Sequence, residues 1–146
     1  CSSDLIEAVN WEQAERASKA SALDYAKSMN AAAMFRRALA EWWHGGFDLL
    51  LTPTLARIPF PVGSFTNDPS DPLKPSRLAS EWVRFTAQFN MSGQPAISLP
   101  LARTASGLPV GVQLVAAYGR EDLLLRVAAQ LETAAPWKSF TPTALD

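Results

Sequence analysis

Two short stretches of alternating apolar residues lie close together in the second half of the chain. Apolar side chains occupy every second position from Ile97 to Leu101 and again from Val110 to Leu114. A period of two is typical of strands with one buried face. Because a short polar segment with Gly107 separates the stretches, we predict a β-hairpin, or two neighbouring strands of one sheet. Pro100 cannot donate a ladder hydrogen bond, so we expect it at a sheet edge or a strand end.

Residues 1–45 are predicted to be helical. Residues 4–18 are rich in Ala and Glu, which favour a helix. Ser21, followed three residues later by Asp24, has the pattern of a capping box at the start of a second helix. That helix ends at Gly45 and Gly46, since glycine accepts the left-handed backbone of a helix C-terminus. Its apolar residues recur at steps of three and four, which predicts one buried face: Tyr25, Met29, Ala32, Phe35, Leu39 and Trp42.

The rest of the chain mixes strands, loops and helices. The apolar run 47–51 predicts a buried strand, and the proline-rich stretch 53–75 predicts a long irregular loop. A helical pattern returns over 76–90, and a last helix begins at Glu121, where the helix dipole favours a negative charge. The buried stripe of this last helix is predicted to be Leu124, Val127, Ala128 and Leu131. The order of elements predicts an α/β fold with a mixed β-sheet flanked by helices.

Composition excludes several classes of protein. The chain has 146 residues and a net charge of −1, so we treat 1–146 as part of a single domain and expect no nucleic acid partner. No apolar stretch is long enough to span a bilayer, so we expect no membrane partner and a cytoplasmic location. Cys1 is the only cysteine and His44 the only histidine, so the chain offers neither a disulfide framework nor a zinc site. We read His44 as a helix-end residue rather than a catalytic one.

Three ordered motifs resemble the C-terminal part of the amidase signature family. They are FDLLLTPT (47–54), FTAQFNMSGQPAISLPL (85–101) and GLPVGVQLVAAYGREDLLLRVAAQLE (107–132). In that family, a strand with a Leu-Thr-Pro-Thr-like end precedes a proline-rich loop, a helix, a Gly-x-Pro-Ala strand start, a Gly-Leu-Pro-x-Gly-x-Gln strand and a closing helix. All of these occur here in that order, over about residues 21–137. The resemblance implies a partial amidase-signature fold, the C-terminal portion only, of the stand-alone bacterial amidase type.

The resemblance also implies a chemistry, the hydrolysis of a carboxamide to a carboxylate plus an amine or ammonia. In the family, a lysine takes a proton through a bridging serine that has a cis peptide bond, and a second serine forms the acyl-enzyme. These residues lie upstream of the region matched here. The lysines of this chain precede no Gly/Ser-rich stretch, so we assign no catalytic residue to it: Lys19, Lys27, Lys74 and Lys138. The partners implied are a small-molecule amide and the N-terminal part of the same protein, with no cofactor.

The helix predicted over 76–90 is the best candidate for contact with substrate. In relatives, the helix at this place helps to wall the acyl or substrate pocket. Ser80, Val83 and Ala87 fall at i, i+3 and i+7, so they share one face of a helix. We therefore expect these three residues to bind substrate, with the small Ala87 leaving room for it. The alternative is that this face packs on the sheet.

Three residues in the other motifs have mainly structural interpretations. Gly93 and Gly111 are expected at turns or at places where backbones approach closely. Gln113 lies on an otherwise apolar strand, and a buried amide needs a partner. It either bonds to neighbouring backbone or touches a ligand.

Two functions of different classes stay open at this point. The intact protein is an amidohydrolase of which this chain alone is inactive, or the chain is a non-catalytic binding or scaffold module derived from an amidase fold. A partial sheet leaves a strand edge and apolar surface uncovered. We therefore expect self-association as a homo-oligomer, or a retained N-terminal piece.

Overall fold

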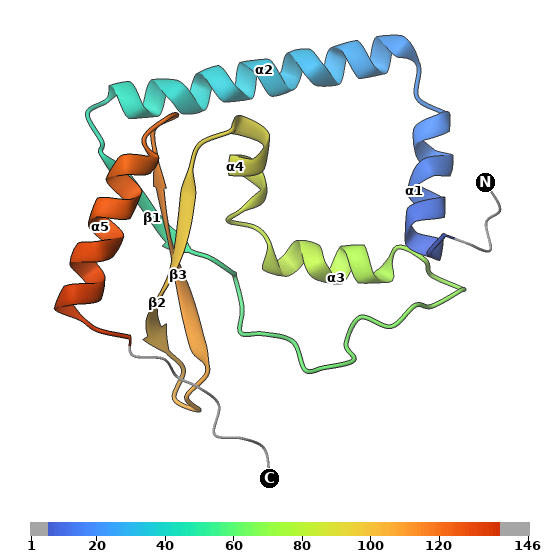
Figure 1. The fold of residues 1–146 in the computed structure, drawn as a ribbon. Helices are drawn as coiled ribbons and strands as arrows, with labels where there is room; N and C mark the ends of the chain where they lie inside the picture. Colours follow the sequence, from blue (N-terminus) through green and yellow to red (C-terminus); the bar gives the residue numbers. More distant parts are fainter. Residues whose placement is uncertain (1–5, 138–146) are drawn as a thin grey trace.

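The computed structural model describes residues 6–137, which form a small sheet surrounded by helices (Figure 1). In chain order the elements are α1 (Ala8–Ser18), α2 (Ala22–His44), β1 (Leu49–Pro53), α3 (Lys74–Trp82), α4 (Ala87–Ser92), β2 (Ala96–Arg103), β3 (Pro109–Ala116) and α5 (Glu121–Ala134). The proline-rich stretch between β1 and α3 contains neither helix nor strand, as predicted. The predicted α/β class with helices around a sheet is confirmed.

The three strands pair antiparallel in the order β1-β3-β2, so the sheet of the described residues is antiparallel and not the mixed sheet that the sequence predicts. Strands β2 and β3 form the predicted hairpin, and Gly107 adopts a φ of 87° in its turn. Pro100 lies in the edge strand β2, beside a register shift between Leu99 and Ala102, so its missing N–H interrupts no central ladder. The hairpin is the part of the fold that the alternating pattern predicts most directly.

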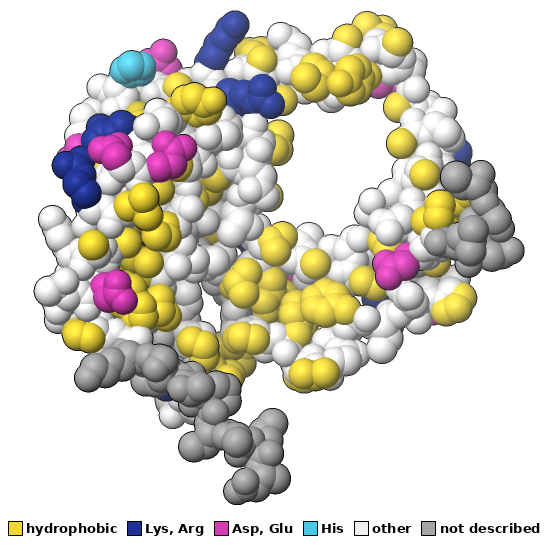
Figure 2. Space-filling model, in the orientation of Figure 1, with side chains coloured by type: hydrophobic (Ala, Val, Ile, Leu, Met, Phe, Trp, Pro, Cys, Tyr) yellow, Lys and Arg dark blue, Asp and Glu magenta, His cyan; other side chains and the backbone are white. Residues whose placement is uncertain are grey.

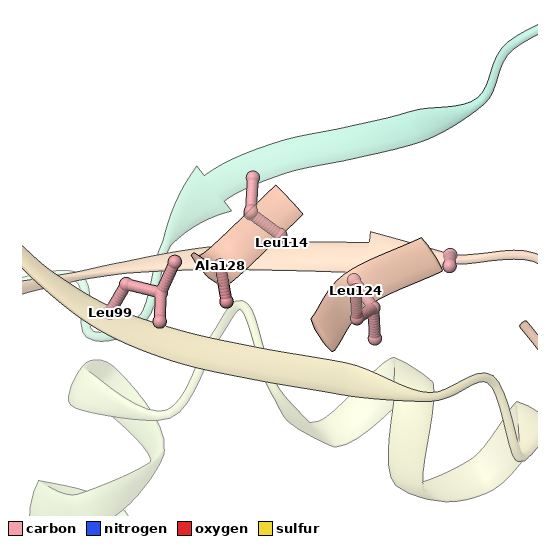
Figure 3. Close-up of a cluster of buried hydrophobic side chains, with 5 residues drawn as sticks. Leu99, Leu114, Leu124 and Ala128 are labelled. Carbon is pink, nitrogen blue, oxygen red and sulfur yellow. The ribbon is translucent and has the colours of Figure 1, made fainter. Parts of the chain in front are cut away.

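The hydrophobic core lies between α5 and one face of the sheet (Figure 3). Leu99 of β2 and Leu114 of β3 meet Leu124 and Ala128 of α5 there, and Ala116 completes the cluster. Leu124 and Ala128 are buried, and Val127 and Leu131 pack against the cluster. The predicted buried stripe of the last helix is therefore confirmed.

Helix α2 forms as predicted, but its apolar face is not buried. The Ser21 hydroxyl accepts from the backbone N–H of Asp24, and the Asp24 carboxylate accepts from the N–H of Ser21, so the capping box is present. No residue of α2 is buried, however, and Tyr25 is 67% exposed. The prediction of a buried face is wrong for this chain because, within the described residues, α4 is the main element that contacts α2.

The single helix predicted over 76–90 is also wrong, because two tertiary hydrogen bonds divide it. Helix α3 ends at Trp82, and α4 begins at Ala87. The Trp82 carbonyl accepts from the N–H of Ala56 at 2.9 Å instead of from the N–H of Thr86. The Phe85 carbonyl accepts from the Gln113 side chain at 2.8 Å. Two carbonyls that would continue an α-helix are thus held by distant parts of the chain.

The described part of the chain is open rather than compact. The chain exposes 10719 Å², against about 7,300 Å² for a compact protein of 15.8 kDa. Figure 2 shows an opening through the molecule, bounded by α1, α2, α3 and α4, with hydrophobic side chains along its rim. Among the described residues, no helix is both long and apolar enough to cross a membrane.

Candidate functional site

The face of the sheet away from α5 carries a row of polar side chains. Thr52 of β1, Gln113 of β3 and Ser98 of β2 stand opposite one another in the strand register, so they project from the same face. Gln113 is 4% exposed, and its side-chain amide donates to the Thr52 hydroxyl at 3.0 Å and to the Phe85 carbonyl at 2.8 Å. Of the two interpretations of Gln113, the structure shows the hydrogen bond to protein. It joins the sheet to the turn between α3 and α4.

Gly111 allows a second polar contact on this face. The hydroxyls of Thr54 and Ser98 lie 2.6 Å apart and are hydrogen-bonded. A Cβ atom on Gly111 would lie 2.7 Å from the Ser98 Oγ and 2.8 Å from the Thr54 Oγ1, so only glycine leaves room for the pair. The expected close approach at Gly111 is confirmed, and Gly93 ends α4 with a φ of 82°, as expected for a turn.

A pocket of about 440 Å³ opens beside this hydroxyl pair. It is lined by residues 53–59 of the irregular loop, by Ser98, and by residues 109–111 of β3. Arg57 is the only titratable side chain in this lining. The pair can hydrogen-bond a ligand, and the lining of this pocket holds no lysine, histidine or carboxylate that would take a proton from either hydroxyl.

A second pocket, of about 450 Å³, is lined by aromatic and aliphatic side chains. Trp82 stacks on Phe60 with ring centroids 3.6 Å apart, and Phe65 meets the edge of Phe60. The indole N–H of Trp82 donates to the Ile58 carbonyl at 2.6 Å, so Trp82 holds the irregular loop against α3. We call this space the aromatic pocket, and its lining is Leu55, Pro59, Phe60, Pro61, Val62, Gly63, Phe65, Ala79, Trp82 and Val83.

The structure brings one of the three predicted substrate residues to this pocket. Val83 lines it and is 40% exposed. Ser80 lies outside the lining and donates its hydroxyl proton to the Arg77 carbonyl at 2.7 Å, while Ala87 begins α4 beyond the turn. The three residues therefore do not share one helix face. All three are exposed, so the alternative that this face packs on the sheet is not seen either.

Sequence reasoning missed the aromatic residues of the loop. Phe60 and Phe65 lie in a segment whose sequence predicts only irregular structure, and no periodicity marks them. The available signal was the loop's length, because long loops within a domain are usually functional or packed over another surface. The sequence marks Trp82 only as a bulky helix residue. In the structure it donates a hydrogen bond to the loop and stacks on Phe60 in the aromatic pocket.

A group of exposed charges holds the start of α3. Arg77 makes a two-pronged pair with the Asp71 carboxylate, and Lys74 lies 3.6 Å from Asp68. Hydrogen bonding to Arg77 lowers the pKa of Asp71, and hydrogen bonding from the Ser70 hydroxyl and N–H lowers the pKa of Asp68. These shifts stabilise charged forms at the surface, which is a structural role rather than that of a general acid or base.

The described residues hold no constellation for catalysis or for a metal. Lys19, Lys27 and Lys74 pair with no Gly/Ser-rich double serine, and Lys138 lies outside the described residues. His44 is the last residue of α2, as expected. No group of three or more His, Cys, Asp or Glu side chains in residues 6–137 could hold a metal ion.

Comparison with known proteins shows which proteins this chain is similar to. The family model described as Amidase matches residues 2–125. The chain is 40% identical over 148 aligned residues to the 6-aminohexanoate-cyclic-dimer hydrolase of Paenarthrobacter ureafaciens, covering 98% of this chain and 30% of that protein. It is 35% identical over 111 residues to an acylamidase of Rhodococcus erythropolis, covering 74% and 23%. The chain thus spans less than a third of the length of these curated relatives.

Solved structures give the same picture. A 6-aminohexanoate cyclic dimer hydrolase complexed with substrate matches with a TM-score of 0.86 and 40% identity, over 94% of this chain and 30% of that one. A glutamyl-tRNA(Gln) amidotransferase chain of Thermotoga maritima matches with a TM-score of 0.56 and 28% identity, over 81% and 25%. Because the family model matches most of its residues, the chain belongs to the amidase signature family, and its partial coverage of relatives is consistent with the C-terminal portion of that fold.

Proposed function

We propose that the intact protein is a stand-alone amidase that hydrolyses a small carboxamide to a carboxylate plus an amine or ammonia. The observation that carries the proposal is the 40% identity and TM-score of 0.86 to a 6-aminohexanoate cyclic dimer hydrolase. The match to the amidotransferase chain has a TM-score of only 0.56. The proposal includes a bacterial source and a cytoplasmic location.

The proposed mechanism places the nucleophile outside this chain. A lysine and a bridging serine supplied by the upstream part activate a second serine, whose hydroxyl attacks the amide carbonyl. The amine leaves with a proton, and water then hydrolyses the acyl-enzyme to release the carboxylate. No metal ion or organic cofactor enters these steps.

This chain would contribute the walls that hold the non-reacting part of the substrate. The aromatic pocket is lined by apolar side chains, which suits an aliphatic portion of a substrate. Val83 stands in that lining, and we keep Ser80 and Ala87 as proposed contacts at the two ends of the same turn region. Binding of this kind raises the rate because remote contacts position the reacting bond.

The exposed apolar surface supports a further part of the proposal, that the N-terminal part of the same protein completes the fold. Helix α2 buries none of its residues, yet it exposes large apolar side chains along its length: Leu23, Tyr25, Met29, Met34 and Phe35. Large apolar side chains left exposed along a whole helix are typical of a surface that another part of a protein covers. The share of the cyclic dimer hydrolase that this chain leaves unmatched is the occupant we propose.

A chimera tests the proposed function. Residues 1–146 replace the matching 30% of the 6-aminohexanoate-cyclic-dimer hydrolase of Paenarthrobacter ureafaciens. We expect a folded hydrolase that cleaves a carboxamide, measured as amine release, whereas the same enzyme without any such segment is inactive. A chimera that folds by circular dichroism and gel filtration but cleaves no amide would favour the alternative, a non-catalytic scaffold module.

The isolated chain gives the complementary test. Purified residues 1–146 should show no amidase turnover, and they should self-associate through the uncovered face of α2 and the edges of the three-stranded sheet. Light scattering at rising concentration measures the second expectation. Measurable turnover would contradict the proposal that the catalytic residues lie outside this chain. A monomer that persists at high concentration would contradict the proposal that the N-terminal part covers α2.

A further inference from the structure

We propose that Gln113 is a positioning residue that fixes the turn at residues 83–86 and thereby sets the shape of the aromatic pocket. The inference rests on the proposed function, because the pocket is taken to hold the substrate's non-reacting part. Gln113 itself does not line the aromatic pocket, so it acts through the turn.

The first step of the argument is the placement of Gln113. It lies on β3, the central strand of the sheet, and is 4% exposed. Its two amide hydrogens have two different acceptors, the Thr52 hydroxyl at 3.0 Å and the Phe85 carbonyl at 2.8 Å. The first bond joins the side chain to β1, and the second joins it separately to the turn between α3 and α4.

The second step is what the bond to Phe85 does to the backbone. In a continuous helix the Phe85 carbonyl would accept from the N–H of Phe89, but that N–H bonds to the Thr86 carbonyl instead. Gln113 therefore occupies one of the two acceptors whose capture separates α3 from α4, the other being the Trp82 carbonyl. Without it, the turn loses its tie to the sheet, and the helical pattern over 76–90 competes for the same residues.

The third step connects the turn with the pocket. Val83 opens the turn, and its carbonyl accepts from the N–H of Thr86 at 3.3 Å and from the Thr86 hydroxyl at 3.2 Å. Its side chain lines the aromatic pocket beside Trp82. A turn that shifts toward helix would carry Val83 with it and change the space that an aliphatic group can fill.

The test compares two variants of the intact protein. Gln113→Met keeps the length of the side chain and removes both donors, so it releases the turn. Thr52→Val is the matched control, because it removes one partner of Gln113 and leaves the bond to Phe85.

Two measurements test the role of Gln113, the kinetics with two substrates and the rate of hydrogen exchange. With acetyl and hexanoyl p-nitroanilides as probes, Gln113→Met should raise KM about tenfold for the hexanoyl probe, with kcat and the acetyl probe changed less than about twofold. In hydrogen exchange followed by mass spectrometry, residues 83–92 should exchange at least about tenfold faster in Gln113→Met, while α5 stays unchanged. Thr52→Val should change neither reading.

The outcomes separate the two proposals. If the intact wild-type protein cleaves neither probe, the proposed function fails, and the exchange measurement still decides the role of Gln113. If exchange over 83–92 is unchanged in Gln113→Met, or if both probes lose activity equally and Thr52→Val does the same, Gln113 is a residue of general stability and the inference is overturned.

Discussion

Gly111→Ala should destabilise the sheet by overpacking at one defined place. The new Cβ would lie 2.7 Å from the Ser98 Oγ, 2.8 Å from the Thr54 Oγ1 and 3.1 Å from the Thr54 Cβ. These atoms belong to short side chains on neighbouring segments, so relief requires a backbone shift or the loss of the 2.6 Å hydrogen bond between the hydroxyls. Gly111 has no positive φ, so backbone strain plays no part.

The size of the effect follows from two opposing terms. Overpacking a well-ordered site costs about 1–3 kcal/mol. Replacing a glycine in a strand interior by alanine recovers roughly 0.5–1 kcal/mol of chain entropy. Combining these ranges gives a net cost between about 0 and 2.5 kcal/mol, so we expect Gly111→Ala to lower the free energy of unfolding by about 1 kcal/mol.

Urea unfolding followed by tryptophan fluorescence measures the change, with Ser98→Ala as the partner in a double-mutant cycle. Ser98→Ala alone should cost about 1 kcal/mol, since it removes the hydrogen bond to Thr54. In the double variant the nearest clash is gone, so its cost should be smaller than the sum of the two. Unfolding energies that add within about 0.5 kcal/mol would refute the steric argument.

Two other predictions concern the irregular loop and the N-terminal cap of α2. Trp82→Phe keeps the ring stacking on Phe60 but removes the hydrogen bond to Ile58, so thermolysin should cut the segment 54–73 faster than in wild type. Phe47→Leu, which alters the stacking of Phe47 on Trp42 at the end of α2, should not have this effect. The Ser21 hydroxyl and N–H lower the pKa of Asp24 from 3.8, so the cap's contribution is present above that value and is lost as pH falls through the lowered folded pKa. Ser21→Ala should raise that pKa in an NMR titration, and an unchanged value would contradict the assignment.

Local signals predicted the parts of the fold that depend on near neighbours. The alternation at Ile97–Leu101 and Val110–Leu114 found the hairpin, and the Ser21–Asp24 spacing found the cap of α2. The stripe of α5 was also correct, because the strands that bury it immediately precede it in the chain. In each case the partner lies within a few dozen residues and the pattern itself specifies the contact.

The predictions that were wrong share one physical cause, because each feature depends on residues that are distant in the sequence. Nothing between residues 76 and 90 signals a break, because the groups that end α3 are the N–H of Ala56 and the side chain of Gln113. The apolar stripe of α2 correctly indicates a helix, but burial depends on what covers it, and the described residues cover little of it. The shared helix face predicted for Ser80, Val83 and Ala87 is not present, because these residues lie on both sides of the turn that separates α3 from α4.

The spacing within the Gly-Val-Gln segment of β3 can be explained by the two faces of the sheet. Leu114 and Ala116 point to the core under α5, so Gly111 and Gln113, on the alternate positions, point to the polar face. There the glycine admits the Thr54–Ser98 pair, and the glutamine, two residues on, reaches the turn beside the aromatic pocket. A shift of one residue in register would send both to the wrong face. The segment therefore joins the core packing on one face of the sheet to the polar contacts on the other face through a single strand.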